Sequence, residues 1–183
     1  QISTLDYDEN SQPGMIITTI TDRNGHTIRY THNCKYEVVS IMDELGNNTT
    51  YTYDSDGNRN SISNALGNTT RMTYDNCRNL TSISDPEGNT TTLTYDQRNN
   101  LISLQNAAGK KTVNSYDDNN RLTSITDPMN NTVCFSYDAD GMLLSRTSPE
   151  GNISSYSYEN GMLKSMTDPS GIISNYQHDA AGR

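Results

Sequence analysis

A tyrosine followed by an acidic residue returns every 21 residues along this chain of 183 residues. Five equal intervals separate the six pairs, which begin at Tyr53, Tyr74, Tyr95, Tyr116, Tyr137 and Tyr158. A fixed period of about 20–50 residues marks a repeat protein, in which one small unit is copied and contacts mainly its neighbours. What one unit can form therefore decides the fold.

Each unit predicts one β-hairpin. The residue two places before the tyrosine is apolar or aromatic in every copy except Asn114, and polar residues alternate with it, which indicates a half-buried strand. A polar segment such as Ser55-Asp56-Gly57-Asn58 follows and predicts a turn, because Gly and Asn accept positive φ at little cost. A second strand then begins at a leucine six residues after the tyrosine, in the order Leu80, Leu101, Leu122 and Leu143.

The second strand predicts a bulge. A recurring serine such as Ser82 precedes a large apolar residue such as Ile83, which lies three places after Leu80. Strict alternation would place Leu80 and Ile83 on opposite faces of the sheet, so we expect one extra residue near the serine. A second turn follows at Asp85-Pro86-Glu87-Gly88, where proline suits the second turn position. His32 and His178 occupy the tyrosine position in two outlying copies.

The predicted fold is all-β: an array of antiparallel β-hairpins of about 21 residues that forms a curved or spiralling sheet. Hydrophobic residues make up 31% of the chain, and the share is the same whether its 12 tyrosines or its 12 glycines are counted. That is below the ~45–50% of ordinary domains and suits either a sheet with one apolar and one solvated face or a disordered chain. The regular tyrosines at strand-like spacing favour the sheet. We expect one array over residues 1–183, clearest over 46–183. Since it begins and stops inside the pattern, we also expect it to be an excerpt of a longer chain.

The charge disfavours two classes of partner. The formal net charge is −9, and the 13 Lys and Arg residues are scattered without forming a basic stripe, so nucleic acid is not an expected partner. No apolar run approaches the ~18 residues of a membrane span. Three cysteines, Cys34, Cys77 and Cys134, stand at unequal places in the repeat, which favours small semi-buried side chains over a disulfide ladder.

Three motifs that could carry chemistry are weak. Asp54-Ser55-Asp56-Gly57-Asn58 resembles a calcium loop, but Thr52 and Ser63 stand where that loop needs acids, so a turn is favoured. The pair of His32 and Cys34 offers two zinc ligands without a second close pair. The chain has no Gly-x-Ser-x-Gly motif to expose a serine nucleophile. We therefore predict no enzyme activity, no catalytic or metal site and no cofactor.

The recurring tyrosines and leucines are the predicted key residues, with a structural role. As a ladder, the tyrosine rings stack on the apolar face and their hydroxyls find polar partners. As a binding surface, exposed rings would stack on sugars or contact a partner protein. Strand alternation places the tyrosines with the other apolar residues, which favours the ladder.

The repeat resembles that of the RHS or YD-repeat family. The likeness rests on Tyr74-Asp75, the stretch Asn79-Leu80-Thr81-Ser82-Ile83 and the turn Asp85-Pro86-Glu87-Gly88-Asn89 with its following threonines, and it covers nearly the whole chain. The resemblance implies β-hairpins that spiral into a hollow shell. Bacterial members enclose a C-terminal toxin in this shell, and in animal teneurins a similar shell belongs to a cell-adhesion protein. The terminal core segment linked to self-cleavage in toxin-carrying members has no match in residues 1–183, so neither the self-cleaving activity nor the toxin itself is assigned to these residues.

The resemblance implies a non-catalytic structural module that encloses a cargo polypeptide such as a C-terminal toxin. The expected partners are the neighbouring repeats, the enclosed toxin domain and other copies bound through sheet edges. The expected location is secreted or at the cell surface, bacterial rather than eukaryotic. The alternative function is a cell-surface recognition module that binds carbohydrate or a partner protein.

Overall fold

The structure, a computed structural model, describes residues 4–8 and 14–178. Within these ranges every regular element is a β-strand, and no helix is long and apolar enough to cross a membrane. The strands are β1 (Thr4–Asp8), β2 (Ile16–Thr21), β3 (Thr27–His32), β4 (Val38–Met42), β5 (Asn48–Tyr53), β6 (Arg59–Ser63), β7 (Thr69–Tyr74), β8 (Leu80–Ser84), β9 (Thr90–Tyr95), β10 (Leu101–Gln105), β11 (Lys111–Tyr116), β12 (Leu122–Thr126), β13 (Thr132–Tyr137), β14 (Leu143–Thr147), β15 (Ile153–Glu159), β16 (Met162–Thr167) and β17 (Ile173–Asn175).

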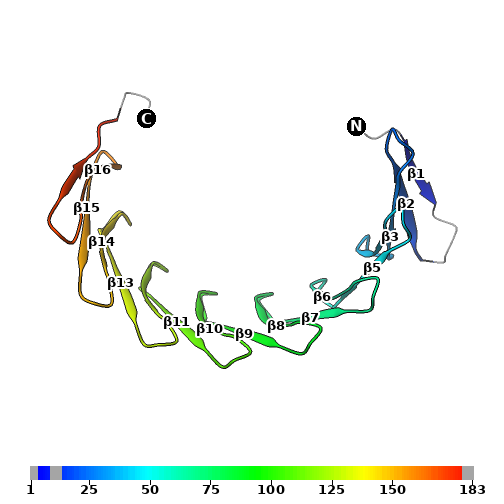
Figure 1. The fold of residues 1–183 in the computed structure, drawn as a ribbon, viewed down its shortest axis with the longest axis horizontal. Coiled ribbons are helices and arrows are strands. Elements are labelled where there is room, and N and C mark those ends of the chain that lie inside the picture. Colours follow the sequence, from blue (N-terminus) through cyan, green and yellow to red (C-terminus); the bar gives the residue numbers. More distant parts are fainter. Residues whose placement is uncertain (1–3, 9–13, 179–183) are drawn as a thin grey trace. The chain divides into compact units, whose positions relative to one another are not determined.

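The strands fall into two compact units, Gln1–Thr92 and Leu93–Arg183. The first unit holds β1 to β8 and the start of β9, and the second holds the rest of β9 and β10 to β17. Within each unit, consecutive strands pair antiparallel in chain order, so each hairpin lies beside the next (Figure 1). The all-β prediction of successive antiparallel hairpins is confirmed.

The predicted bulge is present in the hairpins that begin with the tyrosine strand. In β7 and β8, Tyr74 lies opposite Leu80 while Thr73 lies opposite Ser82, so Thr81 is the extra residue. The same register shift occurs between β5 and β6, β11 and β12, β13 and β14, and β15 and β16. The bulge turns the leucine and the later apolar residue to the same face, as their spacing requires.

Register gives each unit an apolar face and a hydroxyl face. Met72 pairs with Ile83 and Tyr74 with Leu80, and these positions form the apolar face. The intervening positions carry mostly Ser and Thr on the opposite side, because side chains alternate along a strand. On this hydroxyl face the cross-strand pairs bond to each other: the oxygens are 2.6 Å apart in Thr73–Ser82 and also in Ser136–Ser145.

Neither face contains a closed hydrophobic core. Among residues 14–178 no hydrophobic side chain is buried, and the two buried residues are serines, Ser103 and Ser154. A single sheet layer has no second layer to cover its apolar face, so apolar side chains are only half-buried, as in the alternating pattern of β7. Contacts between adjacent strands, both within a hairpin and between neighbouring hairpins, therefore supply the stability.

Both turns of each repeat are built around one side chain, usually an aspartate. In the turn after β5, the Asp54 amide donates to the Asn58 carbonyl at 2.9 Å, and the Gly57 amide donates to the Asp54 carbonyl at 3.2 Å. Gly57 has a φ of 82°, and Arg78 occupies the equivalent position with a φ of 66°. The left-handed conformation suits glycine and burdens a residue with a Cβ, so Arg78 stores strain that Gly57 does not.

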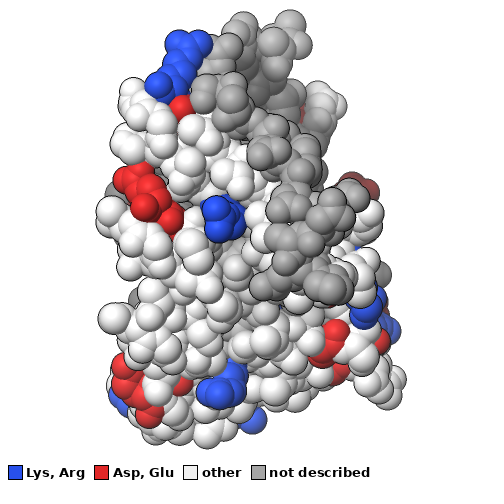
Figure 2. Space-filling model, turned by 90° about the vertical axis from the view of Figure 1, so that its right-hand side faces the viewer, with Lys and Arg blue, Asp and Glu red and all other residues white. Residues whose placement is uncertain are grey.

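Charged side chains are dispersed over the surface. On the face shown in Figure 2, Lys, Arg, Asp and Glu lie singly or in small groups, with uncharged side chains between them. Charges this dispersed act on their immediate neighbours, because water and salt screen them over longer distances.

Candidate functional site: the tyrosine ladder and its turns

The predicted tyrosines join one hairpin to the one before it. The Tyr137 hydroxyl donates to the Leu122 carbonyl at 2.9 Å, and the Tyr116 hydroxyl donates to the Leu101 carbonyl at 3.1 Å. In the first unit, Tyr53 and Tyr74 bond in the same way to Val38 and Arg59, at 2.8 and 3.0 Å. Each bond spans 15 residues and ends at the leucine position of the preceding repeat.

The acceptor is a backbone carbonyl, which explains how the leucine position can vary. Val38 and Arg59 replace leucine there and still receive the tyrosine bond, because every residue offers the same carbonyl oxygen. The histidine at the tyrosine position of the last copy behaves alike, since His178 Nε2 lies 2.8 Å from the Leu163 carbonyl, again 15 residues earlier. A ring with a polar tip is therefore what this position needs.

Asn114 is the exception in the apolar series, and the structure explains it. Its Nδ2 donates to the Leu101 carbonyl at 2.9 Å, so Asn114 and Tyr116 bond to the same oxygen. A carbonyl has two lone pairs and can accept both bonds. In this copy the Asn114 amide makes a hydrogen bond where the other copies place an apolar side chain, and the Tyr116 hydroxyl keeps its usual bond.

The tyrosine rings are half-buried on the apolar face. Burial is the main cause that raises the pKa of Tyr53 above its ordinary value, with a smaller contribution from Glu37, and Arg59 opposes it. Arginines also stack on aromatic rings of this face: the guanidinium carbon of Arg121 lies 5.2 Å from the centre of the Tyr137 ring. These contacts favour the structural ladder over an exposed binding surface.

The predicted leucines lie beside the tyrosines. Leu80, Leu122 and Leu143 lie opposite Tyr74, Tyr116 and Tyr137 within their own hairpins. Leu101 and Leu122 also present their carbonyls to the tyrosine of the following hairpin. Tyr95 ends β9 and Tyr158 lies opposite Leu163 in β15 and β16.

The aspartates after the tyrosines are saturated with hydrogen bonds. Asp54 Oδ1 accepts from the amides of Asp56 and Asn58, and Asp54 Oδ2 accepts from Asn58 Nδ2 at 3.0 Å. The Asn58 side chain is the largest cause that lowers the pKa of Asp54. Equivalent asparagines are the largest cause that lowers the pKa of the corresponding aspartate at Asp43, Asp75, Asp85, Asp96 and Asp127. The turn reading of the calcium-like segment is thereby favoured, since its first carboxylate already holds three donors.

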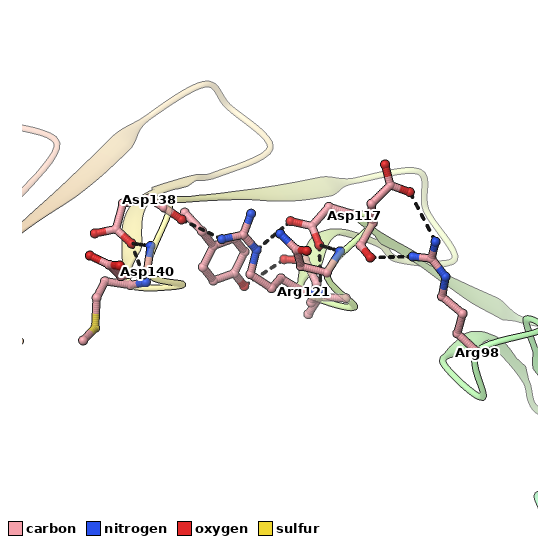
Figure 3. A network of polar contacts seen from close by, with 10 residues as sticks. Arg98, Asp117, Arg121, Asp138 and Asp140 are labelled. Atoms are coloured by element: carbon pink, nitrogen blue, oxygen red, sulfur yellow. Dashed lines mark hydrogen bonds and ion pairs between the residues drawn. The ribbon is translucent and has the colours of Figure 1, made fainter.

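Two arginines of the second unit tie successive turns together, as Figure 3 shows. Arg121 donates through Nε to Asp117 Oδ2 at 2.7 Å and through Nη1 to the Asp138 carbonyl at 2.6 Å. Arg98 donates to the Asp118 carbonyl at 2.7 Å and pairs with the Asp118 carboxylate at 3.5 Å. Each guanidinium thus links its own turn to that of the next hairpin.

Two sets of contacts were not predicted from the sequence. One is the asparagine clamp, in which a turn asparagine such as Asn58 bonds to the turn aspartate, and the other is the pair of arginine ties made by Arg98 and Arg121. The clamp had a signal, because asparagine recurs five residues after the tyrosine at Asn58, Asn79 and Asn100. Arg121 and Arg98 had none, because each occurs once in its place. The structure brings the hydroxyls of four ladder tyrosines, Tyr53, Tyr74, Tyr116 and Tyr137, to backbone carbonyls. Among residues 14–178, no group of three His, Cys, Asp or Glu side chains forms a site that could hold a metal ion.

Comparisons with known proteins point to shells. The sequence pattern of the teneurin YD-shell matches residues 2–87 and again 76–182. No curated protein matches the chain in sequence.

Solved Tc toxin structures share the fold. One is the Tc holotoxin pore of Photorhabdus luminescens with the mutation TccC3-D651A, with a TM-score of 0.65 and 14% identity over 88% of this chain. Another is the TcdB2-TccC3 crystal structure, with a TM-score of 0.62 and 17% identity over 90% of this chain. This chain spans only 11% and 12% of those two chains.

Proposed function

The chain belongs to the teneurin YD-shell family, and on that premise we propose that it is a non-catalytic wall segment of a shell enclosing a cargo polypeptide. The cargo we propose is a C-terminal toxin of the same polypeptide. We also propose that residues 1–183 form one continuous array, secreted or displayed at a cell surface, and bacterial rather than eukaryotic. The Tc toxin structures that share this fold support the toxin cargo.

The observation that carries the proposal is the direction of the polar contacts. The ladder hydroxyls of Tyr116 and Tyr137 bond to the preceding hairpin, and Arg98 and Arg121 bond to the following one. These groups are used to join neighbours, which is what a wall requires. A catalytic site needs polar groups that converge on a substrate.

Protection of the cargo from protease tests the proposal in the full-length protein. We expect the segment downstream of the array to resist trypsin in the native protein. Tyr116→Ala combined with Tyr137→Ala removes two ties between hairpins and should open the wall to protease. Asn119→Ala, in an exposed turn, is the control and should leave the protection unchanged. Cleavage of the downstream segment at the same rate in native and urea-unfolded protein would refute the enclosure.

A further inference from the structure

Arg71 departs from the repeat in the middle of the hydroxyl face. It stands three residues before Tyr74, where the neighbouring copies have Thr50 and Thr92. On its two sides it lies opposite Ser61 of β6 and Ser84 of β8. Directly opposed side chains have Cβ atoms about 4.5–5.5 Å apart, so hydroxyls flank the arginine on both sides.

A shallow groove of about 460 Å³ lies beside Arg71 in the first unit. Its lining includes the arginine, an amide and four hydroxyls: Arg71, Asn60, Thr52, Ser61, Ser63 and Thr69. Binding sites for small ligands commonly start near ~300 Å³, so the space suffices for a small charged group together with what carries it.

The charge of Arg71 is unmatched. Among residues 14–178, the structure gives its exposed guanidinium no hydrogen bond and no ion pair. The strands β5 to β8 contain no Asp or Glu, so the acidic residues of this region lie in the turns. In a chain with a net charge of −9, this groove is a local exception that favours an anion.

The neutral groups around the arginine can supply further donors. Ser63 and Thr69 lie 2.6 Å apart and share one hydrogen, while Thr69 also reaches the Gly67 carbonyl. The Thr52 hydroxyl donates to Asn60 Oδ1, which leaves the two Nδ2 hydrogens of that amide for a ligand. Hydroxyl hydrogens rotate, so they can turn from their present acceptors toward an incoming anion. The acceptors that they leave are exposed, and water can then bond to them.

We propose that this groove binds the tetrahedral oxyanion of a sulfate or phosphate group. The guanidinium fork holds two oxygens in parallel and supplies the charge. A tetrahedral group has further oxygens for Asn60 and the hydroxyls of β6, whereas a carboxylate has only the two that the fork uses. The site does not depend on the shell function, because all of its groups belong to one unit.

Titration of the 183-residue chain with sodium sulfate, sodium phosphate and sodium acetate tests the site. Backbone amide shifts in ¹⁵N-labelled protein give the affinity, with sodium chloride holding the ionic strength constant. Arg71→Thr installs the residue of the neighbouring copies, so the hairpin should fold as before. Arg78→Asn is the control with the same change of charge, since asparagine occupies that turn position at Asn99 and Asn120.

We expect saturable shifts in β5 to β8 with sulfate or phosphate. The guanidinium supplies the charge and two hydrogen bonds, so Arg71→Thr should weaken binding by about tenfold or more, while Arg78→Asn should change it less than about twofold. The tighter anion identifies the source, because phosphate at neutral pH can also donate a hydrogen to the serine oxygens and sulfate cannot. Equal weakening in both variants, equal affinity for acetate, or no saturation by any anion would each overturn the site.

Discussion

Removal of single ladder hydroxyls should cost different amounts at two neighbouring tyrosines. Tyr137→Phe keeps the ring and its contact with Arg121, 5.2 Å from the ring centre, but removes the bond to the Leu122 carbonyl. A neutral hydrogen bond contributes about 0.5–1.5 kcal/mol net, and water has partial access to a half-buried carbonyl. We expect Tyr137→Phe to lower the free energy of unfolding by about 1 kcal/mol.

Tyr116→Phe should cost less, because its acceptor keeps a partner. The Leu101 carbonyl retains the bond from Asn114 Nδ2 at 2.9 Å after the Tyr116 hydroxyl is gone. The penalty for an unpaired carbonyl is therefore avoided, and we expect a loss below about 0.5 kcal/mol. In an Asn114→Leu background, which installs the residue of equivalent position 93, the cost of Tyr116→Phe should rise to about 1 kcal/mol.

Urea unfolding followed by far-ultraviolet circular dichroism measures these differences for the four variants and the parent chain. Equal slopes against urea would show that the variants expose the same surface on unfolding. The double-mutant cycle isolates the coupling of Asn114 and Tyr116 through their shared carbonyl. If Tyr116→Phe costs as much in the parent as in the Asn114→Leu background, the shared acceptor has no energetic role.

Three further predictions concern the turns and the apolar face. Arg78→Gly should raise the free energy of unfolding by about 0.5–1 kcal/mol in urea, because it relieves the positive φ of 66°; a loss would show that the Arg78 side chain outweighs the strain. Leu122→Asp places a charge on the apolar face and should lower the free energy of unfolding by about 2 kcal/mol or more. Asn119→Asp alters an exposed turn and should lower it by less than about 0.5 kcal/mol. Similar losses would mean that the faces are wrongly assigned. The turn carboxylates have pKa values lowered on folding, so their stabilisation is complete above the ordinary aspartate pKa of about 3.9 and is lost as the pH falls through the folded values. The urea midpoint should therefore fall below about pH 4, and a midpoint unchanged down to pH 2 would contradict the stabilising role of these hydrogen bonds to the turn carboxylates.

The periodic features of the fold were predictable because they depend on local chemistry. Alternation around Tyr74, the turn residues that follow, and the spacing of Leu80 and Ile83 predicted a hairpin with a bulge, and the register confirms both the hairpin and the bulge. These properties depend on side-chain direction and on turn geometry within about 20 residues. Since the chain repeats them, each copy supports the same inference.

The contacts between copies were decided by tertiary structure. The residue 15 positions before Tyr137 meets its hydroxyl only because the second turn brings the two hairpins side by side, and sequence alone does not measure that approach. Asn114 and Arg121 each break the repeat, and only the structure shows that one shares a carbonyl with Tyr116 while the other crosses to the Asp138 carbonyl. The sequence thus determined the unit, its turns and its two faces. The hydrogen-bond partner of each tyrosine hydroxyl and arginine guanidinium depended on how one hairpin packs against the next. That packing is set by distances between segments, which the preferences of residues within one segment do not give.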